Sequence, residues 1–114
     1  VVENVPGDAK LSCDEVFGPV VTLQKIATAD EGIDRVNDSV FGLQAGLFSH
    51  DFAFIQRACN RLEAGGVIVN DVPSFRVDHM PYGGIGESGL GREGIKYAME
   101  DMLEPKLMVY PTGW

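Results

Sequence analysis

The chain has 114 residues, and its 17 Asp and Glu against 9 Lys and Arg give a formal net charge of −8. This length allows one small domain with a core, and the acidic balance disfavours the clustered cations by which proteins hold a nucleic-acid backbone. No apolar run approaches the roughly 20 residues of a membrane span, so we expect neither nucleic acid nor a membrane as a partner.

The two cysteines, Cys13 and Cys59, are too few for a disulfide framework and lack the CxxC spacing of a metal or redox site. We therefore expect a reducing, cytoplasmic environment and no metal site. The 14 glycines are roughly twice the usual share, and the first segment, VVENVPGDAK, begins without a start methionine. Both features lead us to expect a piece of a longer protein.

Three elements are predicted in the first 48 residues. The segment 20–26 (VVTLQKI) follows a Gly-Pro pair and alternates enough to predict a strand. A helix comes next, because Thr28 or Asp30 can cap it, and it ends within 37–42. The segment 43–48 (LQAGLF) is a short predicted strand whose small residues favour close approach of another backbone.

The clearest helix begins after Ser49 or Asp51. Its apolar residues repeat at helical spacing, while polar residues occupy most of the opposite face. These apolar residues are Phe52, Ile55, Cys59 and Leu62. The glycine pair at 65–66 provides a stop, and the apolar run 67–69 is short enough to be a buried strand.

Residues 70–94 form a long connection rich in Pro and Gly, and connections of this length are usually functional. A last helix is predicted from about residue 92 to 103, followed by a strand at 106–110. The residues that this helix should bury are Ile95, Ala98, Met99 and Met102. Strands and helices therefore alternate, which indicates an α/β fold with a partly parallel sheet and flanking helices. The central strands are too apolar to face water, so we expect them to pack against surface outside this chain.

The run 83–94, GGIGESGLGREG, contains the pattern G-x-G-x-x-G twice. A dinucleotide-binding fingerprint needs a strand directly before the first glycine, a helix after it, and an acidic residue about 20 positions on. Here the nearest predicted strand ends near Asn70, and Pro81 lies between it and Gly84. We prefer a structural interpretation, in which the glycines adopt positive φ and pack tightly.

Five segments then occur in an order and spacing typical of one family. They are 14–20 (DEVFGPV), 37–43 (N-x-x-x-F-G-L), 66–70 (GVIVN), 81–84 (PYGG) and 88–94 (SGLGREG). Together they resemble the C-terminal part of the catalytic domain of the aldehyde dehydrogenase superfamily, over essentially the whole chain. One departure is Gly86, since the family commonly has Lys or Arg there.

The resemblance implies oxidation of an aldehyde to a carboxylic acid with NAD or NADP as the cofactor. In the family a cysteine thiolate attacks the aldehyde, hydride passes to the nicotinamide, and a glutamate-activated water hydrolyses the thioester. Those catalytic residues and the Rossmann domain lie upstream in the family, so we expect no catalytic residue in this chain. The chain should act only with the remainder of the enzyme.

The resemblance assigns a cofactor role to two residues. Glu15 matches the glutamate whose carboxylate accepts hydrogen bonds from the nicotinamide ribose hydroxyls, and charge-assisted bonds of this kind are strong. Phe17 matches the aromatic residue that lies against the nicotinamide riboside. The alternative from the residues alone is a surface glutamate and a core phenylalanine.

The segment 71–82 matches the family's aldehyde entrance. The resemblance places Phe75 and Tyr82 in its walls, and Arg76 and His79 where they would meet a polar or anionic substrate tail. From the residues alone we favour other contacts: an ion pair of Arg76 with a nearby aspartate, Asp71 or Asp78, and a loop hydrogen bond for His79.

The resemblance also divides the chain into residues 1–103, part of the catalytic domain, and residues 104–114, a strand or tail for homo-oligomer formation. An unpaired strand edge at 106–110 would invite another chain. Two other functions remain open from the residues: a standalone, non-enzymatic α/β interaction module, and a small nucleotide-binding protein built on the glycine run.

Overall fold

The computed structural model describes residues 1–113. Its elements in chain order are β1 (Val2–Glu3), α1 (Lys10–Cys13), β2 (Thr22–Leu23), α2 (Ala29–Asn37), β3 (Phe41–Gly42), β4 (Gln44–Leu47), α3 (Phe52–Arg61), β5 (Gly66–Val69), β6 (Ile85–Gly86) and α4 (Ile95–Asp101). The strands pair two by two: β1 with β2 and β4 with β5 are parallel, and β3 with β6 is antiparallel.

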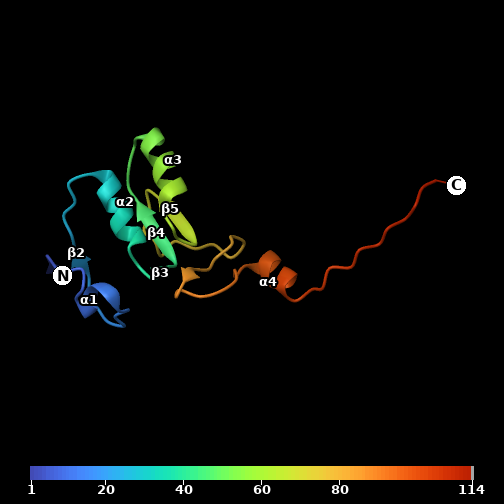
Figure 1. The fold of residues 1–114 in the computed structure, drawn as a ribbon, viewed down its shortest axis with the longest axis horizontal. Helices are drawn as coiled ribbons and strands as arrows, with labels where there is room; N and C mark the ends of the chain where they lie inside the picture. The colour runs from blue at the N-terminus through green and yellow to red at the C-terminus, as the bar shows by residue number, and fades with distance from the viewer. Residues whose placement is uncertain (114) are drawn as a thin grey trace.

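The centre of the fold is the unit β4–α3–β5. The two strands pair in parallel along four residues each, and α3 provides the crossover between them. Figure 1 shows α2 and α3 next to this pair, with β1, β2 and α1 at one end and α4 at the other. The predicted α/β class with a partly parallel sheet is therefore confirmed.

Both central helices begin where their capping residues predict. The hydroxyl of Thr28 accepts a hydrogen bond from the Glu31 amide at 3.1 Å, and the Glu31 carboxylate accepts one from the Ala27 amide at 2.7 Å. This reciprocal arrangement satisfies two helix-end donors and resembles a capping box. In α3 the Asp51 carboxylate accepts from the Phe54 amide at 3.2 Å, as expected for an N-cap aspartate.

Polar contacts fasten α2 to α3. The Asn37 side chain donates to the Arg61 carbonyl and accepts from the Glu63 amide, at 2.8 and 2.9 Å. The Arg61 guanidinium bridges two α2 carboxylates, those of Asp30 and Asp34. Hydrogen bonds and ion pairs, and not a large apolar core, thus hold the C-terminal end of α3 against α2.

The core is very small. Among residues 1–113 the buried apolar side chains are Ile33 of α2, 4% exposed, and Ala58 of α3, 0% exposed. The radius of gyration is 19.1 Å, whereas a compact chain of this length has about 13 Å. Large apolar side chains remain exposed along much of the chain. This agrees with the expectation that the strands pack against surface outside the chain.

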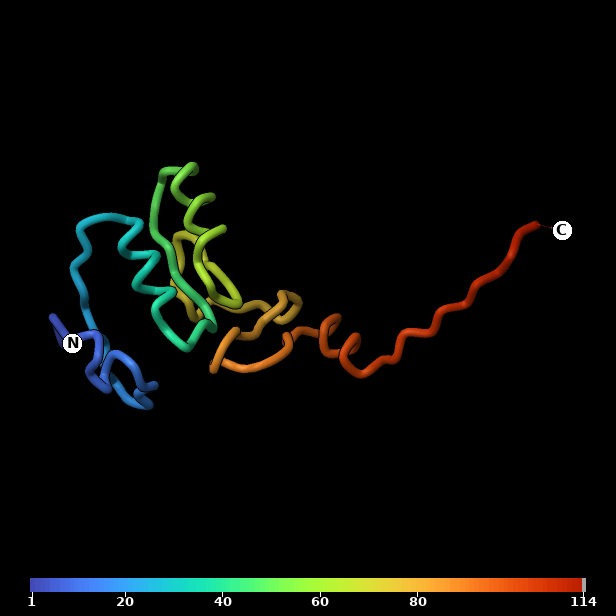
Figure 2. Tube along the Cα trace, viewed as in Figure 1, coloured from blue at the N-terminus to red at the C-terminus, as the bar shows by residue number. Residues whose placement is uncertain are grey.

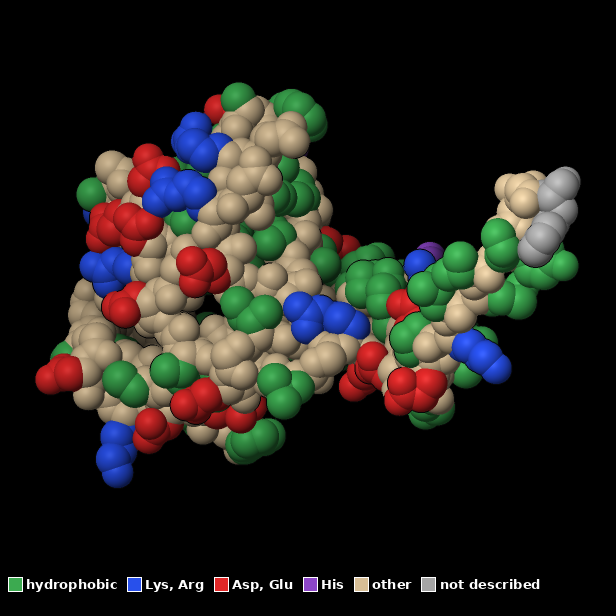
Figure 3. All heavy atoms as spheres, turned by 45° about the vertical axis from the view of Figure 1, so that its right-hand side comes forward, with side chains coloured by type: hydrophobic (Ala, Val, Ile, Leu, Met, Phe, Trp, Pro, Cys, Tyr) green, Lys and Arg blue, Asp and Glu red, His purple; other side chains and the backbone are tan. Residues whose placement is uncertain are grey.

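The C-terminal region differs from the sequence prediction. Residues 104–113 have no strand at 106–110 and extend away from the body (Figure 2). Helix α4 is shorter than predicted, and Ile95, Met99 and Met102 are exposed, with Ala98 half-buried. The prediction that α4 buries these residues is therefore wrong for the single chain, because within residues 1–113 nothing covers Ile95, Met99 and Met102. Figure 3 shows apolar side chains gathered on this extension.

Two smaller predictions also need correction. The strand expected over 20–26 is limited to β2, Thr22–Leu23, whose partner β1 is equally short. Phe52, predicted to lie on the apolar face of its helix, begins α3 but is 75% exposed. The residue that α3 buries is Ala58. No helix within residues 1–113 has the length and apolar character needed to cross a bilayer.

Candidate functional site

The glycine run 83–94 is a structural loop. Its strand β6 lies inside the run and pairs with β3, and α4 begins only after it. Positive φ occurs at four of its glycines: Gly86, Gly89, Gly91 and Gly94. The strand that a dinucleotide fingerprint requires before its first glycine is therefore missing here, and the structural interpretation is confirmed.

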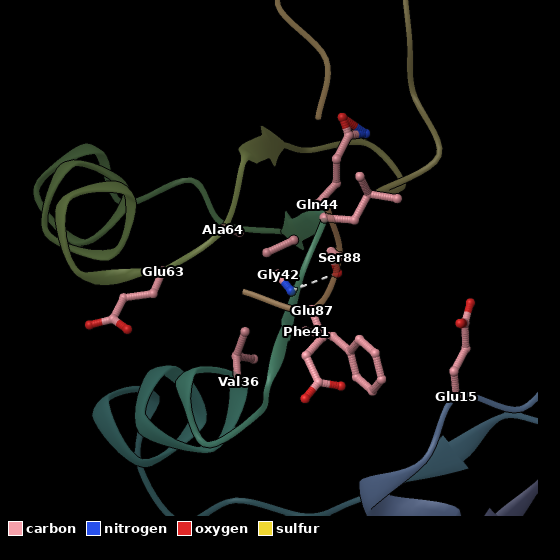
Figure 4. Close-up of a pocket in the computed structure, with 11 residues that line it drawn as sticks. Glu15, Val36, Phe41, Gly42, Gln44, Glu63, Ala64, Glu87 and Ser88 are labelled. Atoms are coloured by element: carbon pink, nitrogen blue, oxygen red, sulfur yellow. Dashed lines mark hydrogen bonds between the residues drawn. The ribbon is translucent and has the colours of Figure 1, made fainter. Parts of the chain in front are cut away.

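The same run approaches two other segments closely. A Cβ atom on Gly65 would collide with the Gly83 carbonyl oxygen, and one on Gly42 would lie 2.6 Å from the Ile85 side chain. The Ser88 hydroxyl accepts a hydrogen bond from the Gly42 amide at 2.9 Å (Figure 4). Glycines at these positions let the loop lie directly against β3 and the start of β5.

Glu15 reaches a cleft beside this loop. The cleft has a volume of about 480 Å³ and includes Phe41, Gln44, Glu87 and Ser88 in its lining. Figure 4 shows Glu15 on the N-terminal segment, set apart from the other labelled residues, with its carboxylate directed upward in this view. Consecutive tight turns, with the Gly18 amide bonded to the Val16 carbonyl oxygen at 2.9 Å, present this segment to solvent.

Phe17 is 93% exposed and does not line that cleft. Phe17 is therefore not a core residue of this single chain. Glu15 and Phe17 are two positions apart in an open segment, so a carboxylate and a flat apolar ring are both accessible to another molecule or to further polypeptide.

Arg76 is held by two residues from the glycine-rich end of the loop. Its Nη2 lies 2.8 Å from a carboxylate oxygen of Glu93, and its guanidinium carbon lies 4.2 Å from the centre of the Tyr82 ring. Tyr82 and Glu93 are themselves joined by two backbone hydrogen bonds, at 3.1 and 2.6 Å. The ion pair expected with Asp71 or Asp78 is thus formed with Glu93 in their place.

The remaining entrance residues lie in the same segment. Phe75 and His79 are exposed, while Tyr82 is half-buried under the guanidinium. Arg76 lines a hollow of about 460 Å³ against α4, which is a different hollow from the cleft that Glu15 reaches. The structure therefore brings Arg76 and Tyr82 together and leaves Glu15 and Phe17 apart from them.

Sequence reasoning missed Gln44. Its side-chain amide donates to the carbonyl oxygens of Pro73 and Phe75, the latter at 3.0 Å. A polar residue among the small and apolar residues of 43–48 was the available sign. No group of three or more His, Cys, Asp or Glu side chains within residues 1–113 is arranged to hold a metal ion.

The chain matches the family model described as the aldehyde dehydrogenase family over residues 1–108. It is 50% identical over 109 residues to a 3-sulfolactaldehyde dehydrogenase of Priestia megaterium, covering 96% of this chain and 23% of that protein. It is 45% identical over 108 residues to a lactaldehyde dehydrogenase of Methanococcus maripaludis, covering 95% and 23%. The chain thus spans about a fifth to a quarter of the length of the curated relatives it matches.

Solved structures of aldehyde dehydrogenases are also similar to this chain. An aldehyde dehydrogenase 21 from Physcomitrella patens, in complex with the reaction product succinate, aligns with a TM-score of 0.87 at 48% identity. That alignment covers 90% of this chain and 21% of the other. A glyceraldehyde-3-phosphate dehydrogenase from Methanocaldococcus jannaschii, complexed with NADP, aligns with a TM-score of 0.81 at 43% identity, covering 88% and 22%. The chain therefore belongs to the aldehyde dehydrogenase family.

Proposed function

We propose that this chain works as the C-terminal part of an aldehyde dehydrogenase that oxidises an aldehyde to a carboxylic acid with NAD or NADP. The match over residues 1–108 carries this proposal. The open, apolar surface supports it too, because the strands require further polypeptide to become buried. The cysteine nucleophile and the base would belong to that polypeptide, as the family resemblance implies.

The proposed cofactor contacts are Glu15 and Phe17. The Glu15 carboxylate has two oxygens that can accept the adjacent hydroxyls of a ribose, and it already lines a cleft. The exposed ring of Phe17 suits the flat face of a nicotinamide riboside. The nicotinamide, when bound, accepts the hydride. Related structures contain NADP or NAD, which leaves both cofactors as candidates.

The proposed substrate class is a short aldehyde with an anionic tail. Relatives of this chain are named for 3-sulfolactaldehyde and sulfoacetaldehyde, and one related structure holds succinate. Arg76 donates one guanidinium nitrogen to Glu93 and stacks on Tyr82. A guanidinium has five N–H donors, so it can also bind a sulfonate or carboxylate. Phe75 and His79, exposed in the same segment, would form the adjacent wall of the entrance.

We also propose a cytoplasmic homo-oligomer. The residues from 104 onward form the tail assigned to assembly, and its apolar side chains are exposed as far as they are described, among them Leu107 and Val109. Extended backbone with unpaired groups can pair with a strand of another subunit. The free cysteines, Cys13 and Cys59, agree with a reducing compartment.

The test uses a chimera in which this chain replaces the matched segment of the P. megaterium enzyme. Two aldehydes, 3-sulfolactaldehyde and lactaldehyde, differ only in the sulfonate. A hydrogen bond to a charged group contributes about 1.5–3 kcal/mol, so Arg76→Ala should lower kcat/KM for 3-sulfolactaldehyde about 10- to 100-fold and spare lactaldehyde.

The matched control is Arg57→Ala, because Arg57 is also an exposed arginine that lies over an aromatic ring, that of Phe54, but on α3. It should leave the preference between the two aldehydes unchanged. Equal losses of kcat/KM for both aldehydes in Arg76→Ala would contradict the anionic substrate class. The proposal that the enzyme is an aldehyde dehydrogenase would still stand.

A further inference from the structure

Gln44 of β4 is bonded to the segment that carries Arg76. Its Nε2 donates to the Pro73 carbonyl oxygen and, at 3.0 Å, to the Phe75 carbonyl oxygen. The Phe75 carbonyl belongs to the peptide group whose nitrogen is that of Arg76. The Gln44 amide therefore fixes the peptide plane immediately before the guanidinium-bearing residue.

The surrounding strand residues leave room for this contact. The partner of Gln44 in the β4–β5 register is Gly66, and a Cβ atom there would lie only 3.3 Å from the Gln44 side-chain oxygen. Two positions along β4, on the same face, a Cβ atom on Gly46 would lie 3.0 Å from the Pro73 ring. Gly46, Gly66 and Gln44 thus form the surface of the β4–β5 pair against which the loop residues 73–75 pack.

The other end of the loop is held independently. Tyr82 and Glu93 pair through their backbones and hold the Arg76 guanidinium from the far side. Arg76 consequently lies between two attachments, one to its own peptide and one to its side-chain tip. In Figure 4 the Gln44 side chain is directed away from Phe41 and Glu87, out of the line that joins them to Glu15.

We propose that Gln44 is a positioning residue for substrate specificity, which orients Arg76 toward the anionic tail of the aldehyde. This inference rests on the proposed substrate class. Gln44 also lines the cleft that Glu15 reaches, but its amide nitrogen is bonded to the loop, and we assign its effect on the aldehyde to the loop. Recognition of a planar or tetrahedral anion by a guanidinium depends on its orientation, so a loop released from β4 binds the tail less well.

The experiment uses the same chimera with Gln44→Met, which keeps the length of the side chain and removes its donors. We expect KM for 3-sulfolactaldehyde to rise about tenfold, since small misplacements of a binding group have large effects. The KM for lactaldehyde and kcat for both aldehydes should change less than about twofold, because the reacting groups are untouched. The control Gln56→Met makes the same change on the exposed side of α3 and should alter neither KM.

A double-mutant cycle separates this inference from the function on which it rests. If Gln44 acts through Arg76, then Gln44→Met adds no further loss in an Arg76→Ala background. Unchanged selectivity in Arg76→Ala would overturn the anionic substrate class and the role of Gln44 with it. Changed selectivity in Arg76→Ala, but equal KM changes for both aldehydes in Gln44→Met, would overturn the role of Gln44 alone.

A second variant guards against misfolding. Gln44→Glu keeps size and polarity but places a carboxylate against two carbonyl oxygens, so it should raise KM for 3-sulfolactaldehyde at least as much as Gln44→Met. If both Gln44 variants fail to fold while Gln56→Met folds, Gln44 serves stability and the specificity assignment is wrong.

Discussion

At the residue scale, glycines and a few side-chain amides determine how the loop 70–94 lies on the strands. Gly42 and Gly65 admit backbone where a side chain would collide. Gln44 binds carbonyl oxygens of this loop 29 and 31 residues away, and Asn37 likewise binds backbone groups of Arg61 and Glu63, 24 and 26 residues away, at the end of α3. Contacts of this kind replace a large apolar core as the means of positioning the proposed entrance.

A substitution at Gly65 tests the close approach. In the chimera, Gly65→Ala should lower the free energy of unfolding by about 1–3 kcal/mol, because the new methyl group would meet the Gly83 carbonyl oxygen and force a backbone shift. Gly7→Ala is the control, since no atom lies within 4 Å of the corresponding position. Chemical denaturation measures both, and equal stability of the two variants would contradict the described packing.

A substitution at Glu15 tests the cofactor contact. Glu15→Gln should raise KM for the nicotinamide cofactor about tenfold, because it removes the charge from an acceptor of ribose hydroxyls, and such charge-assisted bonds contribute about 1.5–3 kcal/mol. Glu3→Gln, an exposed glutamate of β1, is the control. An unaltered cofactor KM in Glu15→Gln would remove Glu15 from the proposed site.

At the element scale, features of the nearby sequence were sufficient to predict the two central helices and the strands next to them. Capping by Thr28 and Asp51 and the helical spacing of apolar residues predicted α2 and α3, and short apolar runs predicted β4 and β5. Each of these features depends on neighbours within one or two turns. Helix α4 was predicted correctly as a helix, but its burial and the strand at 106–110 were mispredicted, because both depend on surface outside residues 1–113.

The start of α2 carries a titratable contact. Hydrogen bonds from the Ala27 amide and the Arg35 side chain lower the pKa of Glu31 below its usual value of 4.5. A lowered pKa in the helical state means that the ionised carboxylate stabilises the helix. This contribution is fully present above pH 4.5 and is lost as pH falls through the lowered pKa.

A peptide of residues 26–39 tests this contact, because all its partners lie within that range. Its helix content should exceed that of the Glu31→Gln peptide at pH 7, and the difference should vanish under acid, as measured by circular dichroism near 0 °C. Other carboxylates titrate equally in both peptides, so the difference reports Glu31. A difference that persists in acid would contradict the ionic contact.

At the scale of the whole molecule, the exposed apolar surface is the dominant feature. Strands that pair only two by two cannot offset the conformational entropy of ordering the chain, and among the helices only α2 and α3 bury an apolar side chain, one each. We therefore expect the isolated chain to unfold without a cooperative transition and to bind a hydrophobic dye. Calorimetry and dye fluorescence measure this, and a sharp transition without dye binding would indicate a self-sufficient module.

The sequence predicted those parts of the candidate site that lie within one short motif, but not the contacts between segments that are distant in sequence. The motif around Glu15 indicated an accessible carboxylate, and the glycine run was correctly interpreted from its context. The partner of Arg76 was mispredicted, because two aspartates are nearer in sequence than Glu93, which the chain brings back only through the bend at Gly84 to Gly91. The contact of Gln44 with the loop likewise depends on tertiary approach and has no local pattern.

The most direct measurement is reduction of NAD or NADP by the chimera, in which this chain supplies the C-terminal segment of the P. megaterium enzyme. We predict reduced cofactor, detected by its absorbance, in the presence of 3-sulfolactaldehyde and stoichiometric formation of the carboxylic acid. A chimera that is folded and assembled like its parent, yet forms no reduced cofactor with this aldehyde or with lactaldehyde, would contradict the account.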